Sequence, residues 1–257
     1  TDTIARDVTD YPSHPYFGNR DKNCYTEDIY VGYRYFCTFA RDKVLYPFGY
    51  GMSYTTFGYT DCTVEKNGDQ VTASLTVTNT GAHKGKEVVQ VYLQAPQGKL
   101  GKPERVLAAF AKTKELAPGE TQKLIMTFAL YDFASFDDLN ETGNEYCFVL
   151  EQGDYGVRIS TDAMYDVYCW GFELPEDVVV CRCNQAMWPV EDFEKMKPVL
   201  RDGKCEVSFQ KVIGQPNDLR SKINAGVPAE IPYTGDVGIK LVDVRDGKAT
   251  MDAFIAQ

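Results

Sequence analysis

The sequence predicts a mainly β protein built on an antiparallel β-sandwich with irregular flanking segments. Between residues 71 and 78, apolar side chains alternate with threonine and serine, which places the apolar ones on one face. Similar alternating runs lie at 89–93, 124–130 and 155–159. The 17 tyrosines and 14 phenylalanines also suit pleated strands. Short strands separated by turns indicate a sandwich rather than βαβ units.

Two features of these runs make the prediction specific. Leu150, Gly153 and Tyr155 have the spacing of a tyrosine corner, in which a tyrosine hydroxyl ties the start of a strand to the preceding loop. Alternation also predicts which side chains fill the interior of the sandwich. The residues predicted to face inward are Val71, Leu75, Val77, Val91, Phe128, Val157 and Ile159.

Two apolar segments leave their secondary structure open. Periodicity does not decide whether residues 28–36 form a strand or a buried helix turn. Residues 103–110 contain good helix formers, so local propensity slightly favours a helix turn there. Residues 47–51, with two glycines, are predicted to form a bend, because no helix follows that would make them a phosphate-binding loop.

The last third of the sequence has a different character, with long irregular stretches. We predict strands at 178–180 and 239–244 and a short helix at 190–196. Thr250 is a suitable N-cap for a helix over residues 251–257, where no stop signal precedes the last residue. This pattern predicts a truncated amphipathic helix.

The net charge of the chain argues against some classes of binding partner. The formal net charge of −10 repels nucleic acid and anionic membrane surfaces, so we predict neither as a partner. No apolar run approaches the roughly 18 residues that a membrane-spanning helix needs. The first residues also lack the basic and apolar segments of a signal peptide. We therefore expect a protein without membrane segments.

The eight cysteines are predicted to be reduced, structural thiols of a cytosolic protein, because their spacings are scattered and the chain is long enough for a core. Cys181 and Cys183 form the one close pair, and His14 and His83 are the two histidines, so we predict no metal site and no cofactor. The cysteines are Cys24, Cys37, Cys62, Cys147, Cys169, Cys181, Cys183 and Cys205.

The sequence gives only weak support for any catalytic residue. Asp137 and Asp138 are adjacent carboxylates, but neighbouring strand or turn residues point in different directions. We interpret them as solvated loop charges. Ser135 has no histidine near it in the sequence that would act as its base.

Several motifs resemble family 3 glycoside hydrolases. The runs YTEDIYVGYRYF at 25–36 and LYPFGYGMSYTTF at 45–57 resemble the end of the family's α/β-sandwich domain. The next stretch is similar to its fibronectin type III-like domain. The matching runs there are VTNTG at 77–81, GKEVVQVY at 85–92, LAPGE at 116–120, ASFD at 134–137 and GDY at 153–155. The resemblance implies that Arg105 to Phe110 form a strand, against local propensity.

The order of the matched segments implies three parts. Residues 1–51 are expected to end the α/β-sandwich domain, residues 52–174 to form the fibronectin type III-like domain, and residues 175–257 to connect to the catalytic barrel. The run DGKATMDAFIAQ at 246–257 resembles the opening helix of that barrel. This order is that of permuted members of the family, such as β-glucosidases of anaerobic gut bacteria, and implies a bacterial cytoplasmic enzyme.

The resemblance also implies which functional residues the chain lacks. A retaining glycosidase needs two carboxylates about 5–5.5 Å apart. In this family one follows a barrel strand, in a motif resembling Ser-Asp-Trp, and neither Trp170 nor Trp188 follows an aspartate. The other lies in the α/β-sandwich domain, upstream of anything matched here. We therefore assign no catalytic residue and predict that the chain alone is inactive.

The expected role is an accessory, structural part of a hydrolase acting on β-glucosides, whose partners are the remaining catalytic domains. The alternative is a free-standing carbohydrate-binding or protein-interaction module. Glu27, Tyr33, Arg34 and Tyr35 form a possible border of the substrate site. The competing interpretation is that their aromatic rings are core and that Arg34 pairs with a local carboxylate. Without their usual partner domains, the aromatic residues around 30–36 and the helix at 251–257 are expected to expose apolar surface.

Overall fold

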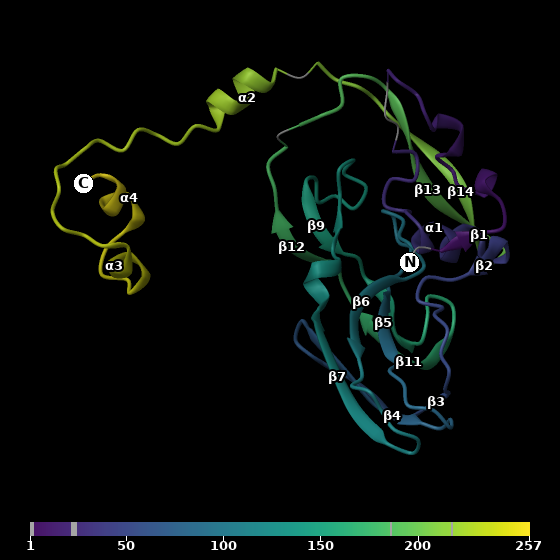
Figure 1. The fold of residues 1–257 in the computed structure, drawn as a ribbon. Helices are drawn as coiled ribbons and strands as arrows, with labels where there is room; N and C mark the ends of the chain where they lie inside the picture. Colours follow the sequence, from purple (N-terminus) through teal and green to yellow (C-terminus); the bar gives the residue numbers. More distant parts are fainter. Residues whose placement is uncertain (1–2, 22–24, 186, 217) are drawn as a thin grey trace. The chain divides into compact units, whose positions relative to one another are not determined.

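The computed structural model describes residues 3–21, 25–185, 187–216 and 218–257, and the chain divides into two compact units. Unit 1 consists of Thr1–Gln185 and Glu191–Gly214, and unit 2 of Ala186–Val190 and Gln215–Gln257. Figure 1 shows the β-sandwich of unit 1 and helices of unit 2.

Two antiparallel sheets form the sandwich. The first sheet has the strand order β3-β4-β7, and the second has the order β11-β10-β5-β6. The strands of the first sheet are β3 Phe57–Asn67, β4 Gln70–Asn79 and β7 Thr121–Ala129. The strands of the second are β5 Val88–Gln94, β6 Val106–Lys112, β10 Gly153–Ser160 and β11 Asp166–Leu174. The predicted fold class is confirmed, and the segment at 103–110 enters a strand rather than a helix.

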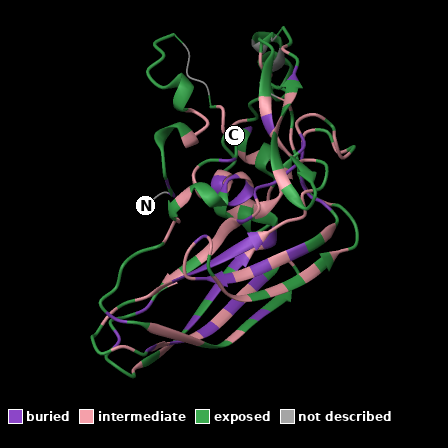
Figure 2. Ribbon diagram, turned by 90° about the vertical axis from the view of Figure 1, so that its right-hand side faces the viewer, coloured by how far each residue is buried: buried purple, intermediate pink, exposed green. Residues whose placement is uncertain are grey.

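The core lies between these two sheets. Along β4, buried positions alternate strictly with partly exposed ones, as the banding of the strands in Figure 2 illustrates. All seven residues predicted to face inward are buried. The Tyr155 hydroxyl donates to the Glu151 carbonyl oxygen over 2.9 Å, which confirms the tyrosine corner.

Unit 1 also contains a third sheet, a hairpin and a small strand pair. The third sheet has the order β12-β9-β8, and β13 pairs with β14. The bounds are β8 Ser135–Phe136, β9 Cys147–Leu150, β12 Val178–Arg182, β13 Phe193–Arg201, β14 Lys204–Val212, β1 Ile4–Ala5 and β2 Val44–Tyr46. The strand predicted at 178–180 is confirmed, whereas the helix predicted at 190–196 is wrong because β13 occupies most of that segment.

Helix α1, Tyr33–Phe39, resolves the ambiguity of the first apolar segment. Its residues Phe36 and Cys37 are buried, as is Tyr30 just before it. Tyr33 packs on Tyr92 of β5 with ring centroids 5.7 Å apart, and its hydroxyl accepts from the Leu107 amide over 2.9 Å. The expectation that Tyr30 and Phe36 would be left exposed is therefore wrong, because the chain itself covers them.

The bend at 47–51 docks on the same sheet. The Phe48 carbonyl oxygen accepts from the Ala163 amide over 2.9 Å, and the Phe48 ring stacks on Tyr33. At Gly49 the backbone has φ +86°, and an added Cβ would lie 2.0 Å from Nε2 of Gln90. Only glycine can adopt this positive φ and also fit this close to Gln90, which explains why residue 49 of the bend is a glycine.

Unit 2 contains helices α2 Leu219–Ala225, α3 Leu241–Arg245 and α4 Met251–Ile255. The strand predicted at 239–244 is wrong. The Asp243 carboxylate accepts from the Lys240 amide over 2.9 Å, so an acidic side chain caps α3. Thr250 caps α4 as predicted, through a bond from the Ala253 amide, but this helix ends at Ile255. Met251 and Ile255 are exposed, as expected, whereas Phe254, which was also expected to be exposed, is half-buried.

Among the described residues, short 3-10 helices connect the larger elements at Val8–Asp10, His14–Tyr16, Arg41–Lys43 and Leu130–Phe133. Within the described part of the chain, no helix is both long enough and apolar enough to cross a bilayer.

Candidate functional site

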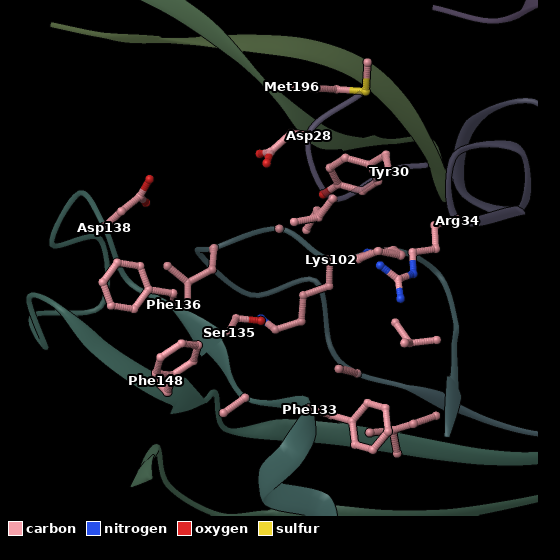
Figure 3. A pocket seen from close by; sticks show the side chains of 18 of the residues that line it. Asp28, Tyr30, Arg34, Lys102, Phe133, Ser135, Phe136, Asp138, Phe148 and Met196 are labelled. Carbon is pink, nitrogen blue, oxygen red and sulfur yellow. The ribbon is translucent and has the colours of Figure 1, made fainter. Parts of the chain in front are cut away.

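A pocket of about 550 Å³ opens in unit 1 beside the sandwich. Its lining comes from the segment before α1 and α1 itself, the loop at 100–103, the start of β6, residues 132–138, β9 and β13. Figure 3 shows Asp28 and Asp138 at one side of this pocket and Arg34 at the other, with Phe136 and Phe148 next to each other. The volume is within the range of small-molecule sites.

Of the four residues predicted to border a substrate site, only Arg34 lines this pocket. Tyr33 packs into the sandwich, as described above. Tyr35 packs edge-to-face on Phe36 with centroids 5.2 Å apart, and burial raises the pKa of its hydroxyl. Glu27 accepts from the Ser13 amide over 3.2 Å. Of the four, the structure thus places only Arg34 in the pocket wall, while the charge of Glu27 acts on Tyr35 and contributes to the raised pKa of its hydroxyl. Most of the pocket lining was not predicted.

Arg34 pairs with no carboxylate in the described part of the chain. Its side chain lies part-exposed in the pocket wall and forms no ion pair with any residue in the described ranges. Its backbone oxygen accepts from the Thr38 hydroxyl over 2.6 Å, a contact that holds the helix and does not involve the guanidinium. The pocket therefore contains the positively charged guanidinium of Arg34, which forms no ion pair with any described residue.

Asp28 and Asp138 form the acidic side of the pocket, next to the cation of Lys195. Nζ of Lys195 donates to both carboxylate oxygens of Asp138, over 2.7 and 2.9 Å. Partial burial raises the pKa of the Asp28 carboxyl, the charge of Lys195 opposes this rise, and the like charge of Asp138 adds to it. The positive charge of Lys195 thus acts on Asp28, although Asp28 forms no ion pair with any described residue.

One wall of the pocket is held by a buried ion pair. Nζ of Lys102 contacts the Glu151 carboxylate, and both side chains are only 5% exposed. The same carboxylate accepts from the amides of Lys99 and Leu100, over 2.6 and 3.3 Å. The loop between β5 and β6 is therefore folded around Glu151.

The interpretation of Asp137 as a solvated charge is wrong. Its side chain is fully buried and accepts from the Glu141 amide and from both the amide and the hydroxyl of Thr142. Burial by itself raises the pKa of this carboxyl, but these hydrogen bonds outweigh it and lower the pKa. Asp137 organises its loop, and only the neighbouring Asp138 reaches the pocket.

A second, partly buried network of charged groups joins the strands of the sandwich. Asp166 accepts from Arg105 over 2.7 Å, from Arg158 over 2.9 Å and from the Ser160 hydroxyl over 2.8 Å. Burial alone raises the pKa of the Asp166 carboxyl, but the hydrogen bond and charge of Arg105, supported by Ser160 and Arg158, lower it overall. The depressed pKa means that the carboxylate form stabilises the fold.

This network predicts an acid-dependent loss of stability. A carboxyl group with a lowered folded-state pKa contributes stability above its unfolded pKa, near about 3.9, and loses it as the pH falls further. We expect Asp166→Asn to cost about 1–3 kcal/mol near neutral pH and progressively less toward about pH 3. Urea unfolding at several pH values measures this. Glu206→Gln, in an exposed pair with Arg201, is the control and should show little pH-dependent difference. An unchanged Asp166→Asn cost across the pH range would contradict the assignment.

Among the described residues, no group of three or more histidine, cysteine, aspartate or glutamate side chains is arranged to hold a metal ion. Seven cysteines are free thiols, while Cys24 lies outside the described residues.

Comparison with known proteins places these features in a family. Residues 87–163 match the model of the fibronectin type III-like domain. The whole chain is 46% identical to a segment covering 26% of a β-glucosidase from Ruminococcus albus. It also superposes over its full length on 29% of a β-glucosidase from Paenibacillus barengoltzii, with a TM-score of 0.82 and 43% identity. A GH3 β-glucosidase from Bifidobacterium adolescentis matches 67% of the chain at 31% identity, with a TM-score of 0.59.

The chain belongs to family 3 of the glycoside hydrolases. It corresponds to the part of these proteins that contains the fibronectin type III-like domain. It spans about a quarter of the length of the R. albus relative, so most of such a protein has no counterpart in this chain. The family resemblance inferred from the motifs at 25–57 and 77–155 is confirmed.

Proposed function

We propose that the chain is an accessory, structural part of a family 3 β-glucosidase and contributes no catalytic carboxylate. The observation that carries this proposal is the full-length match to a quarter of the R. albus β-glucosidase, a match that contains the fibronectin type III-like domain. A buried ion pair, a second charged network and the docked α1 give this part a rigid frame. Such a frame is suited to positioning neighbouring domains.

The proposed division into parts follows the family motifs. Residues 1–51 end an α/β-sandwich domain, residues 52–174 form the fibronectin type III-like domain, and residues 175–257 connect to a catalytic barrel. The partners are then the remaining domains of the enzyme, and the substrate of the whole protein is a β-linked glucoside. We further propose the bacterial cytoplasm as its location, because the cysteines suit a reducing compartment.

Glu27, Tyr33, Arg34 and Tyr35 remain our candidates for a border of the substrate site. Arg34 is the strongest of them, because its guanidinium has no ion-pair partner in the described part of the chain. In the complete enzyme, replacing Arg34 would change KM if the border assignment holds. A change in thermal stability alone would assign it a structural role.

The experiment that tests the accessory role is an activity assay. We expect the isolated chain to show no hydrolysis of p-nitrophenyl β-glucoside above a buffer blank, because it lacks the pair of carboxylates that retaining hydrolysis requires. The complete enzyme, purified in the same way, is the positive control. Turnover by the chain that persists after repeated purification would refute the proposal.

A further inference from the structure

Hairpin β13–β14 contributes to one wall of the pocket, although few of its side chains are buried. Met196 and Val212 are buried, and the other residues of the two strands are part-exposed or exposed. Lys195 and Met196 line the pocket, and Figure 3 shows Met196 and Phe133 at opposite sides of it. Because burial of apolar surface is the main source of stability, the hairpin is anchored more weakly than the strands of the sandwich.

Polar side chains on one face of the hairpin supply part of its anchorage. Lys195 and Lys197 lie two residues apart in β13 and therefore share a face, and the register places Gln210 of β14 opposite Lys195. In addition to the contact between Lys195 and Asp138, Nζ of Lys197 donates to the Glu141 carboxylate over 3.0 Å. The side-chain amide of Gln210 donates to the same carboxylate. Three side chains of one face thus bind two carboxylates of a single loop.

The loop that carries these carboxylates is itself held in place. Buried Asp137 accepts from the backbone amides of Glu141 and Thr142, so the loop keeps its shape whether or not the hairpin is bound to it. Burial raises the pKa of the Glu141 carboxyl, but hydrogen bonds from Lys197 and Gln210 and the charge of Lys197 lower it overall. Glu141 is therefore a carboxylate at neutral pH and attracts the lysine.

The two ion pairs are too exposed to hold the hairpin tightly. The exposed fractions of the four side chains lie between 20% and 36%. Water and dissolved ions compete for such charges, so each pair contributes little and weakens further at high ionic strength. Opening the hairpin breaks these pairs and uncovers Met196 and Val212. Opening of the sandwich at β7 disrupts the core cluster, to which Met126 belongs.

We propose that hairpin β13–β14 is a flap at the pocket, latched to the loop at 137–142 by Lys195 and Lys197, and that it opens in solution while the sandwich stays folded. Opening exposes Met196 and gives solvent and ligands access to the pocket from this side. The hairpin and the loop both belong to unit 1, so the flap depends on contacts within one unit. This conformational role goes beyond the proposed structural function.

Oxidation of methionine by dilute hydrogen peroxide tests the flap in the 257-residue chain, because peptide mass spectrometry detects the oxygen added to each side chain. Met196 is 3% exposed and Met126 is 5% exposed, so a permanently closed hairpin gives equally slow oxidation of both. We expect Met196 to react at least about tenfold faster than Met126, because the hairpin opens more often than the core. Met52, which is almost fully exposed, marks the fast limit. Oxidation of Met196 as slow as that of Met126 would overturn the proposal.

Salt and charge reversal test the latch itself. Raising sodium chloride to about 1 M should speed oxidation of Met196 by about threefold or more, because it screens the part-exposed ion pairs. The double variant Lys195→Glu with Lys197→Glu should have at least the same effect, and Met126 should respond to neither change. Circular dichroism confirms that the variant is folded, and Lys195→Met with Lys197→Met replaces it if it is not. Fast oxidation of Met196 that ignores both salt and these substitutions would mean that peroxide enters a closed pocket, and refutes the latch.

Two further variants separate the latch from a general effect of charge. Adding Asp138→Lys and Glu141→Lys to the charge-reversed variant restores opposite charges across the contact and should slow oxidation of Met196 again. Arg201→Glu with Lys204→Glu reverses two exposed cations at the turn of the same hairpin and should leave the rate unchanged. Equal acceleration by this control, or no recovery in the fourfold variant, refutes the assignment of the latch. Neither result affects the activity assay of the proposed structural role.

Discussion

Replacing Glu151 with alanine is expected to destabilise unit 1 by about 3–5 kcal/mol, because it leaves a buried ammonium group without its partner. Lys102 is only 5% exposed, so water cannot replace the missing carboxylate without opening the loop. The amides of Lys99 and Leu100 lose their acceptor in the same substitution. Urea unfolding followed by circular dichroism measures the change in free energy.

Two controls show whether the effect arises from burial of the charge. Glu115→Ala removes an ion pair with Lys84 in which both side chains are largely exposed, and should cost only about 0–1 kcal/mol. The double variant Glu151→Met with Lys102→Met removes both charges and should recover part of the loss. A loss from Glu151→Ala as small as that from Glu115→Ala would mean that the pair is solvated in solution. The pocket beside the sandwich would then lack the rigid wall assigned to it.

The sandwich could be predicted from the sequence because its strands each keep one face buried. Alternation along residues 71–78 depends only on the local period of two, and the matching strands repeat the same pattern. Local propensity failed at residues 106–110, where pairing of β6 with β5 decides the structure. The side chains there fit a sheet as well as a helix, so only the partner strand settles the outcome.

The hairpin β13–β14 escapes prediction from the sequence for a different reason. Pro198 and the charged residues along β13 hide any clean alternation, so the local pattern favours a helix. The signal that could have revealed the hairpin is Asp202-Gly203, where both residues have positive φ, of 48° and 76°. This pair is typical of a two-residue hairpin turn, and the register pairs Arg201 with Lys204 across it.

The pocket could not be predicted because its lining comes from separate parts of the chain. Asp28 precedes α1, Asp138 follows β8 and Lys195 lies in β13, so their proximity depends on how the hairpin packs beside the sandwich. No spacing in the sequence encodes that arrangement. Asp137 illustrates the same limit, since its burial depends on a loop that closes through Glu141 and Thr142.

Replacing Leu75 with alanine is expected to cost about 2–5 kcal/mol, through lost burial and the cavity that remains. Leu75 lies at the centre of β4, is fully buried, and faces Leu124 of β7 in the sheet register. Both sheets contribute side chains to the same core cluster, so neighbouring side chains cannot collapse fully into the space without moving a strand.

The matched control lies on the opposite face of the same sheet. Ile125 is adjacent to Leu124 in β7, pairs with Ser74, and is 64% exposed. Ile125→Ala removes a similar amount of apolar side chain but should change the free energy of unfolding by only about 0.5 kcal/mol. Equal costs for the two variants in urea unfolding would show that the inward face of β4 is assigned incorrectly. A large cost for Leu75→Ala alone follows directly from the alternation that predicts the sandwich, because it assigns one face of each strand to the core.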